Sequence, residues 1–101
     1  GGENVPVVEI EAMLYAHPSV LDAAIVGYPD ARMGERGCLF LALKPGTTFT
    51  MDDLTALMAE NGAAKQYWPE ALEIIDVMPR TASGKIQKFT LKEQAAKHAV
   101  S

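Results

Sequence analysis

Residues 79–88 hold the side chains of this sequence that are best suited to chemistry. They read Pro-Arg-Thr-Ala-Ser-Gly-Lys-Ile-Gln-Lys, so that small and hydroxylated residues precede Gly84 and Lys85. A glycine permits a tight turn and a close approach to another molecule, and the lysine after it would carry an ammonium group at the tip of a loop. This compact charge with three donors suits a carboxylate or phosphate oxygen. The sequence therefore predicts an anion-directed loop, with an ordinary solvated turn as the alternative.

This loop is not a phosphate-binding loop of the Walker type. Such a loop needs two glycines at a fixed spacing and a Ser or Thr after the lysine. Here only Gly84 precedes Lys85 within the segment, and Ile86 follows it. The loop by itself therefore gives no support for a nucleotide cradle.

Other polar and aromatic side chains favour structural roles. His17 stands before a proline at a predicted helix end, where it suits the helix dipole better than it suits base catalysis. Tyr67 and Trp68 are expected to be packing anchors, with stacking on a ligand as the alternative. A local ion-pair network is expected from the charged residues Asp30, Arg32, Glu35 and Arg36.

Composition sets the limits on domain number and partners. The chain has 101 residues, of which 49% are hydrophobic and 22% charged, which fits one folded domain and excludes a disordered tail or a disulfide scaffold. Nine Lys and Arg against thirteen Asp and Glu give a formal net charge of −4. This balance argues against nucleic acid or an anionic membrane as a partner held by bulk charge. No apolar stretch reaches the roughly 18–20 residues of a membrane span.

Two further expectations concern the environment of the only cysteine and the start of the chain. Cys38 opens an apolar run over residues 38–43, so a buried structural thiol is expected, in keeping with a reducing, cytoplasmic compartment. The chain begins Gly-Gly-Glu-Asn without a methionine, as if cut from a longer chain at a glycine hinge.

The elements that must position Lys85 follow from periodicity. Apolar spacing predicts a helix over residues 6–16, with Pro6 at its first position after a cap at Asn4 or Val5. Apolar runs predict strands at 20–27, 37–43 and 72–77, with a charged loop or bulged hairpin connection over 30–36.

Two capping-box patterns predict the remaining helices. Thr50 with Asp53 would open a helix ending near Gly62, and Thr90 with Glu93 would open the last one, through about His98. A short turn is expected over 63–67. The order helix, strand, strand, helix, strand, helix predicts an α+β fold in which helices flank a small sheet of about three strands.

Residues 79–88 resemble the closing motif of the AMP-forming acyl-CoA synthetases and related adenylating enzymes, which include luciferases and peptide-synthetase adenylation domains. Residues 1–11, GGENVPVVEIE, resemble the segment that opens their C-terminal domain after the hinge. Residues 17–20, 23–30 and 34–35 match its middle. The resemblance covers essentially the whole chain. It implies that residues 1–101 are one C-terminal domain, a mobile lid whose large N-terminal domain is absent from this sequence.

The resemblance also implies an acid–thiol ligase. A carboxylic acid and ATP form an acyl-adenylate and pyrophosphate, and the thiol of CoA then displaces AMP. ATP, CoA and Mg²⁺ would bind mainly through the absent N-terminal domain, which would be this domain's partner. Lys85 matches the lysine that orients the acyl carboxylate and offsets charge at the α-phosphate. Gly1, Gly2 and Glu3 match the lining of the pantetheine tunnel, with a flexible cut end as the alternative. The isolated domain is expected to be inactive.

Several readings stay open at this stage. The sequence looks most like members that act on short-chain, medium-chain or alicyclic acids. An adenylation domain that loads a carrier protein is one alternative, and a non-enzymatic α+β interaction module is another. Contact with CoA is possible for the network over 30–36 and for three basic residues, Lys44, Lys65 and Arg80. Lys88 and Lys92 are expected to face solvent.

Overall fold

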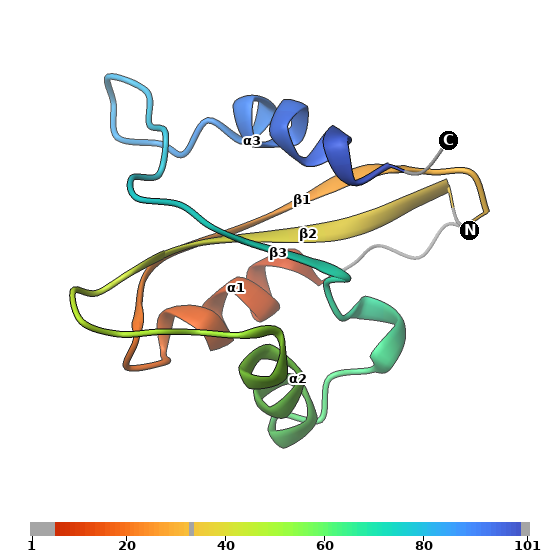
Figure 1. Cartoon of the computed structure of the whole chain (residues 1–101), viewed down its shortest axis with the longest axis horizontal. Coiled ribbons are helices and arrows are strands. Elements are labelled where there is room, and N and C mark those ends of the chain that lie inside the picture. Colours follow the sequence, from red (N-terminus) through yellow and green to blue (C-terminus); the bar gives the residue numbers. More distant parts are fainter. Residues whose placement is uncertain (1–5, 33, 100–101) are drawn as a thin grey trace.

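The computed structural model describes residues 6–32 and 34–99 and has three layers (Figure 1). Helices α1 (Val7–Tyr15) and α2 (Met51–Glu60) lie on one face of a sheet, and helix α3 (Lys88–Ala95) covers the other face. Two short 3-10 helices complete the helical elements, η1 (Lys65–Tyr67) after α2 and η2 (Ala96–His98) after α3. The predicted α+β class is confirmed.

The sheet has three strands in the order β1-β2-β3. Strands β1 (Val20–Asp30) and β2 (Gly34–Leu43) form an antiparallel hairpin, and β3 (Ala71–Ile74) pairs parallel to β2. A parallel pair needs a long crossover, which here runs through α2 and η1. In this order β1 is an edge strand, and no strand among residues 6–32 and 34–99 lies on its outer side.

The central strand β2 serves two hydrophobic cores because successive side chains of a strand point to opposite faces. Leu39 and Leu41 join the core under α1 and α2, whereas Cys38 and Phe40 join the core under α3. All four side chains are fully buried. Packing on both faces of β2 holds the three layers together.

A β-bulge near the start of β1 reverses the face to which one acidic residue points. Val20 pairs with Leu43 and Asp22 with Ala42, so that Leu21 is the extra residue. Val20 packs in the core under α1 and α2, whereas in a regular strand Asp22 would point to that same face. The bulge turns Asp22 to the α3 side instead, as bulges commonly do.

Most element boundaries agree with prediction, and the hairpin is longer than expected. The ladder continues through Tyr28–Arg36, Pro29–Glu35 and Asp30–Gly34, so the charged connection over 30–36 is largely strand. Proline is tolerated in β1 because this strand lies at the edge of the sheet. Helix α1 begins at Val7 with Pro6 as its N-cap rather than its first residue. The proposed caps Asn4 and Val5 lie outside the described residues.

Two predicted boundaries are wrong. The third strand ends at Ile74 rather than at residue 77, because its last backbone bond joins Ile75 to Leu41 before the chain turns away. The capping box at Thr90 does not form, since α3 begins at Lys88 with Gln87 as an N-cap that makes no side-chain bond. Within the described part of the chain, no helix has both the length and the apolar character needed to cross a lipid bilayer.

Candidate functional site

Lys85 lies in a tight loop between β3 and α3, and backbone hydrogen bonds close the base of this loop. Arg80 and Ile86 form an isolated antiparallel bridge. The N–H of Thr81 donates to the carbonyl of Lys85 at 2.7 Å, and the N–H of Gln87 donates to the carbonyl of Pro79 at 2.9 Å. The segment predicted as a loop is therefore an ordered turn with a fixed shape.

The small and hydroxylated residues serve the turn itself. Gly84 has a φ of 89°, a left-handed conformation that side chains disfavour. Its N–H donates to the carbonyl of Thr81 at 2.9 Å. The hydroxyl of Thr81 accepts from the N–H of Lys85 at 3.1 Å and lies 3.0 Å from the hydroxyl of Ser83. These residues consequently shape the loop, and the lysine is left to meet another molecule.

The ammonium of Lys85 is exposed and unpaired within the described residues. No carboxylate among residues 6–32 and 34–99 lies within ion-pair distance of it, although four other basic residues in the C-terminal part of the chain each have one. Those four are Arg80, Lys88, Lys92 and Lys97. An exposed, unpaired ammonium on a fixed loop is suited to an anion supplied from outside this domain.

The basic residues on either side of Lys85 have acidic partners in distant parts of the chain. Arg80 Nη2 lies 2.5 Å from Asp22 Oδ1, and Lys88 Nζ lies 2.8 Å from Glu11 Oε2. Lys88 and Lys92 are solvent-exposed, as predicted, yet each also has an acidic partner, Lys92 being 3.7 Å from Glu35. The sequence analysis did not identify Asp22 or Glu11, because nothing local links them to the loop.

The other predicted residues take the structural roles expected of them. His17 Nδ1 accepts from the N–H of Ser19 at 3.1 Å, and its ring packs edge-on against Phe49 with centroids 5.0 Å apart. Trp68 donates its Nε1–H to the carbonyl of Ala63 at 2.9 Å. Trp68 and Tyr67 both pack against the core under α1 and α2, which confirms them as packing anchors.

The charged network of the hairpin is confirmed in part. Arg36 Nε lies 2.5 Å from Asp30 Oδ2, and Asp30 also accepts from the backbone N–H of Arg32 at 2.9 Å. The second partner of Arg36 is Glu70, just before β3, and was not predicted. Glu35 points instead toward Lys92. The network ties the hairpin to the segment that enters β3.

Cys38, Glu73 and His98 form the group most suited by residue type to a metal ion. Their ligand atoms all lie within 4.8 Å of one another, and these residue types bind Zn²⁺ in proteins. Both oxygens of Glu73 already have partners, His98 Nε2 at 2.7 Å and Lys97 Nζ at 3.1 Å. Burial, and secondarily Glu73, raises the pKa of the Cys38 thiol to about 12. Glu73 is therefore engaged by hydrogen bonding to His98 and by an ion pair with Lys97, contacts that fix η2 to β3.

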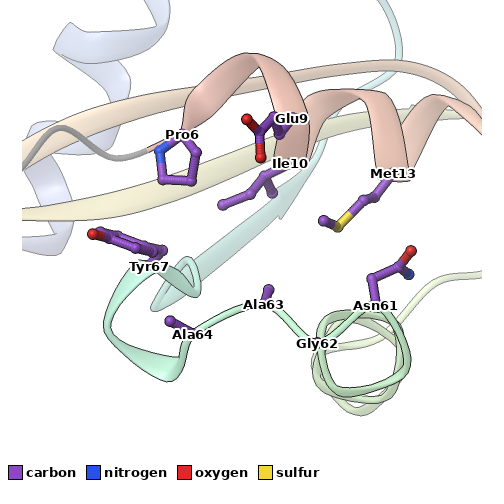
Figure 2. A pocket seen from close by; sticks show the side chains of 9 residues that line it. All are labelled: Pro6, Glu9, Ile10, Met13, Asn61, Gly62, Ala63, Ala64 and Tyr67. Carbon is purple, nitrogen blue, oxygen red and sulfur yellow. The ribbon is translucent and has the colours of Figure 1, made fainter.

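A cavity of about 240 Å³ lies on the opposite side of the sheet from the Lys85 loop (Figures 1 and 2). Side chains of α1 face the segment after α2 across it, and the lining is Pro6, Glu9, Ile10, Met13, Asn61, Gly62, Ala63, Ala64 and Tyr67. No lysine or arginine is among these residues, and the volume is below the usual range of about 300–1,000 Å³ for ligand pockets. The cavity is therefore a poor site for a nucleotide.

The fold and the loop define a small α+β domain with an exposed lysine on an ordered loop. Residues 9–85 match the family described as AMP-binding enzyme C-terminal domain, and the chain belongs to this family. The resemblance seen in the sequence is thereby confirmed.

Curated relatives and solved structures agree with this assignment. The chain is 40% identical over 94 residues to a medium-chain fatty-acid–CoA ligase of Escherichia coli, covering 92% of this chain and 17% of the relative. It is 37% identical over 98 residues to an acetate–CoA ligase of Humulus lupulus, covering 94% and 17%. The crystal structure of ATP-bound MatB from Rhodopseudomonas palustris superposes with a TM-score of 0.88 at 30% identity, covering 97% and 19%. The chain thus spans less than a fifth of each of these proteins.

Proposed function

We propose that this domain serves an ATP-dependent, AMP-forming acyl-CoA ligase, which converts a carboxylic acid, ATP and CoA into acyl-CoA, AMP and pyrophosphate. Family membership and the ligase names of the relatives support the class of reaction. The observation that carries the proposal is the exposed ammonium of Lys85, which has no acidic partner among the described residues. A large N-terminal domain is the partner that would supply the rest of the site.

In this proposal Lys85 acts in the first half-reaction. An oxygen of the substrate carboxylate attacks the α-phosphorus of ATP, and pyrophosphate leaves with the electrons of the broken bond. The ammonium of Lys85 orients the carboxylate and offsets the charge that develops on the phosphate oxygens. Positioning together with electrostatic stabilisation is the chemistry that a lysine on a fixed loop provides.

ATP and Mg²⁺ are held mainly by the N-terminal domain in this scheme. The acidic side chains beside the loop, Asp22 and Glu11, already pair with Arg80 and Lys88. The loop therefore offers its free charge as a cation, which suits a phosphate or carboxylate and not a metal ion.

The second half-reaction completes the proposal. After adenylation the domain rotates as a lid and withdraws Lys85, so that the thiol of CoA attacks the acyl carbon and AMP leaves. Gly1, Gly2 and Glu3 would line the pantetheine tunnel in that orientation; they lie outside the described residues, and this role stays a prediction. The buried thiol of Cys38 is consistent with a reducing compartment, and we assign the enzyme to the cytoplasm.

The acid substrate belongs to the short-chain or medium-chain class in this proposal. The two ligase relatives named above have similar identities of 40% and 37%, yet one is named for medium-chain fatty acids and the other for acetate. Similarity in this domain therefore does not separate these substrates, and we place the selectivity for the acid in the N-terminal domain. An alicyclic acid remains a prediction from the sequence alone.

The decisive variant is Lys85→Ala in the full-length ligase. We expect acid-dependent exchange of pyrophosphate into ATP to fall about 10²- to 10³-fold, since one charge that stabilises the transition state is lost. Formation of thioester from supplied acyl-adenylate and CoA should stay within a few-fold of the wild type. Lys92→Ala is the matched control, because it removes a lysine whose ion pair is exposed on both sides. Adenylation that stayed within a few-fold of the wild type in Lys85→Ala would contradict the proposal.

A further inference from the structure

Two ion pairs fasten the Lys85 loop to the body of the domain, one on each side of the lysine. Arg80 reaches Asp22 on β1, which is 58 positions away in sequence, and Lys88 reaches Glu11 on α1, which is 77 positions away. Lys88 is also the first residue of α3. Both ends of the loop are consequently fixed to elements from the start of the chain.

Arg80 links the strand to the residue just before Lys85. While Nη2 binds Asp22, Nη1 donates to the carbonyl of Gly84 at 2.6 Å. Asp22 faces the loop because of the bulge at Leu21, and its Oδ1 also accepts from the hydroxyl of Tyr15 at 3.1 Å. The guanidinium thus connects the body of the domain with the peptide bond that precedes Lys85.

Glu11 links three elements through one carboxylate oxygen. Its Oε2 accepts from the N–H of Ile25 on the free edge of β1, at 2.9 Å, and from Lys88 Nζ at 2.8 Å. Glu11 therefore satisfies a backbone donor that has no neighbouring strand. The same oxygen ties α1, β1 and the start of α3 together around the edge of the sheet.

The exposure of the two ion pairs indicates how much they can contribute to the stability of the domain. The side chains of Arg80 and Lys88 are 41% and 45% exposed, whereas those of Asp22 and Glu11 are 18% and 17% exposed. Partly exposed ion pairs of this kind add little to stability, because solvent screens their charges. Catalysis is far more sensitive to geometry, since a misplacement of about 1 Å can cost a factor of about 10² in rate.

We propose that Arg80 and Lys88 are positioning residues, which hold the Lys85 loop through Asp22 and Glu11 in the geometry that adenylation requires. The inference rests on the proposed function of Lys85. It also gives Arg80 a role other than the CoA phosphate contact considered from the sequence. In that other role Arg80 would affect the thioester step and the KM for CoA.

The test uses the full-length ligase with near-isosteric variants of each pair, Arg80→Gln and Asp22→Asn for the first, Lys88→Gln and Glu11→Gln for the second. We expect each to lower the kcat of adenylation about 10- to 100-fold, with the melting temperature nearly unchanged and the thioester step from supplied acyl-adenylate unaffected. The double variant Asp22→Asn/Arg80→Gln should be no worse than Arg80→Gln alone, because that single variant already removes the contact with Asp22. Lys88→Arg, which keeps the charge, should retain activity.

A control variant and the outcomes that contradict the positioning role can be told apart by experiment. Lys92→Gln breaks the exposed pair with Glu35 and should leave both half-reactions unchanged. Adenylation within twofold of the wild type in the pair variants would overturn the inference, and so would equal loss of both half-reactions with a lowered melting temperature. A raised KM for CoA in Arg80→Gln alone would instead support a contact between Arg80 and a phosphate of CoA. If Lys85→Ala itself left adenylation intact, the proposed function would fail as well. If Lys85→Ala impaired adenylation while the pair variants remained active, only the positioning role would be rejected.

Discussion

Lys85 and Cys38 have two of the potentially nucleophilic side chains of this domain, and their environments are opposite. Lys85 is exposed in an ordered loop. Cys38 is fully buried in the core under α3, and burial raises the pKa of its thiol to about 12. A thiol with so high a pKa is protonated and unreactive at neutral pH. The lysine is therefore accessible to another molecule, whereas the cysteine serves packing.

The buried thiol makes stability depend on alkaline pH. The pKa is about 12 in the folded chain, against an ordinary value of 9.0, so the unfolded chain loses this proton first as the pH rises. The stabilisation is therefore complete below about pH 9 and declines toward pH 12, by up to about 1.4 kcal/mol for each pH unit.

Cys38→Ala removes that proton equilibrium. Urea unfolding of the 101-residue domain at about pH 8 and about pH 10.5 should show a clearly smaller alkaline loss of unfolding free energy in the variant than in the wild type. The cavity left by the substitution lowers both values alike and cancels in the comparison. An equal alkaline loss in the two proteins would show that the thiol does not titrate as its burial requires.

At the scale of elements, the start of α2 depends on one reciprocal cap. The hydroxyl of Thr50 accepts from the N–H of Asp53 at 3.2 Å, and the carboxylate of Asp53 accepts from the N–H of Thr50 at 2.8 Å. We expect Thr50→Ala to lower the unfolding free energy by about 1 kcal/mol, measured by urea denaturation.

Thr55→Ala provides the matched control within the same helix. Thr55 is exposed, and its hydroxyl donates to the carbonyl of Met51 at 3.0 Å, so it caps nothing. Since alanine has the higher helix propensity, this variant should be as stable as the wild type or slightly more stable. Similar losses in both variants would assign the effect of Thr50→Ala to something other than the cap.

The two capping-box patterns show how far local sequence can predict an element. The pattern at Thr50 succeeds because Thr50 and Asp53 accept from one another's backbone N–H groups. At Thr90 the preceding loop determines where the helix begins. The N–H of Gln87 donates to the carbonyl of Pro79, and the carbonyl of Gln87 accepts from the N–H of Thr90 at 3.1 Å. Helix α3 therefore starts earlier than its own sequence indicates.

The loop was predictable in position and in its lysine but not in its attachments. Residues 79–88 have local signals, a glycine for the turn and hydroxyls for the backbone. Asp22 and Glu11 are ordinary acidic residues far away in sequence, and only the bulge in β1 and the free edge of that strand bring them to the loop. Contacts that depend on tertiary structure produce no periodic pattern in the sequence.

At the scale of the whole molecule, the two cores share the β1–β2 hairpin, whose strands contribute side chains to both. Leu39 and Leu41 pack toward α1 and α2, and Phe40 packs toward α3. Neither helical layer has a sheet of its own. The domain should therefore unfold as one cooperative unit, so that a substitution in one core destabilises both layers of helices.

Phe40→Ala tests this coupling, because the only tryptophan lies in the opposite layer. Trp68 packs against the core under α1 and α2, while Phe40 is fully buried in the core under α3. Loss of the ring should cost about 3–5 kcal/mol and should shift the urea midpoint seen by Trp68 fluorescence and by circular dichroism equally. Phe89→Ala, at a position 69% exposed on α3, should shift neither by more than about 0.5 kcal/mol. If Trp68 kept its wild-type midpoint while the helical signal fell early, the α3 layer would unfold by itself, and the loop that carries Lys85 would be free to move without the rest of the domain.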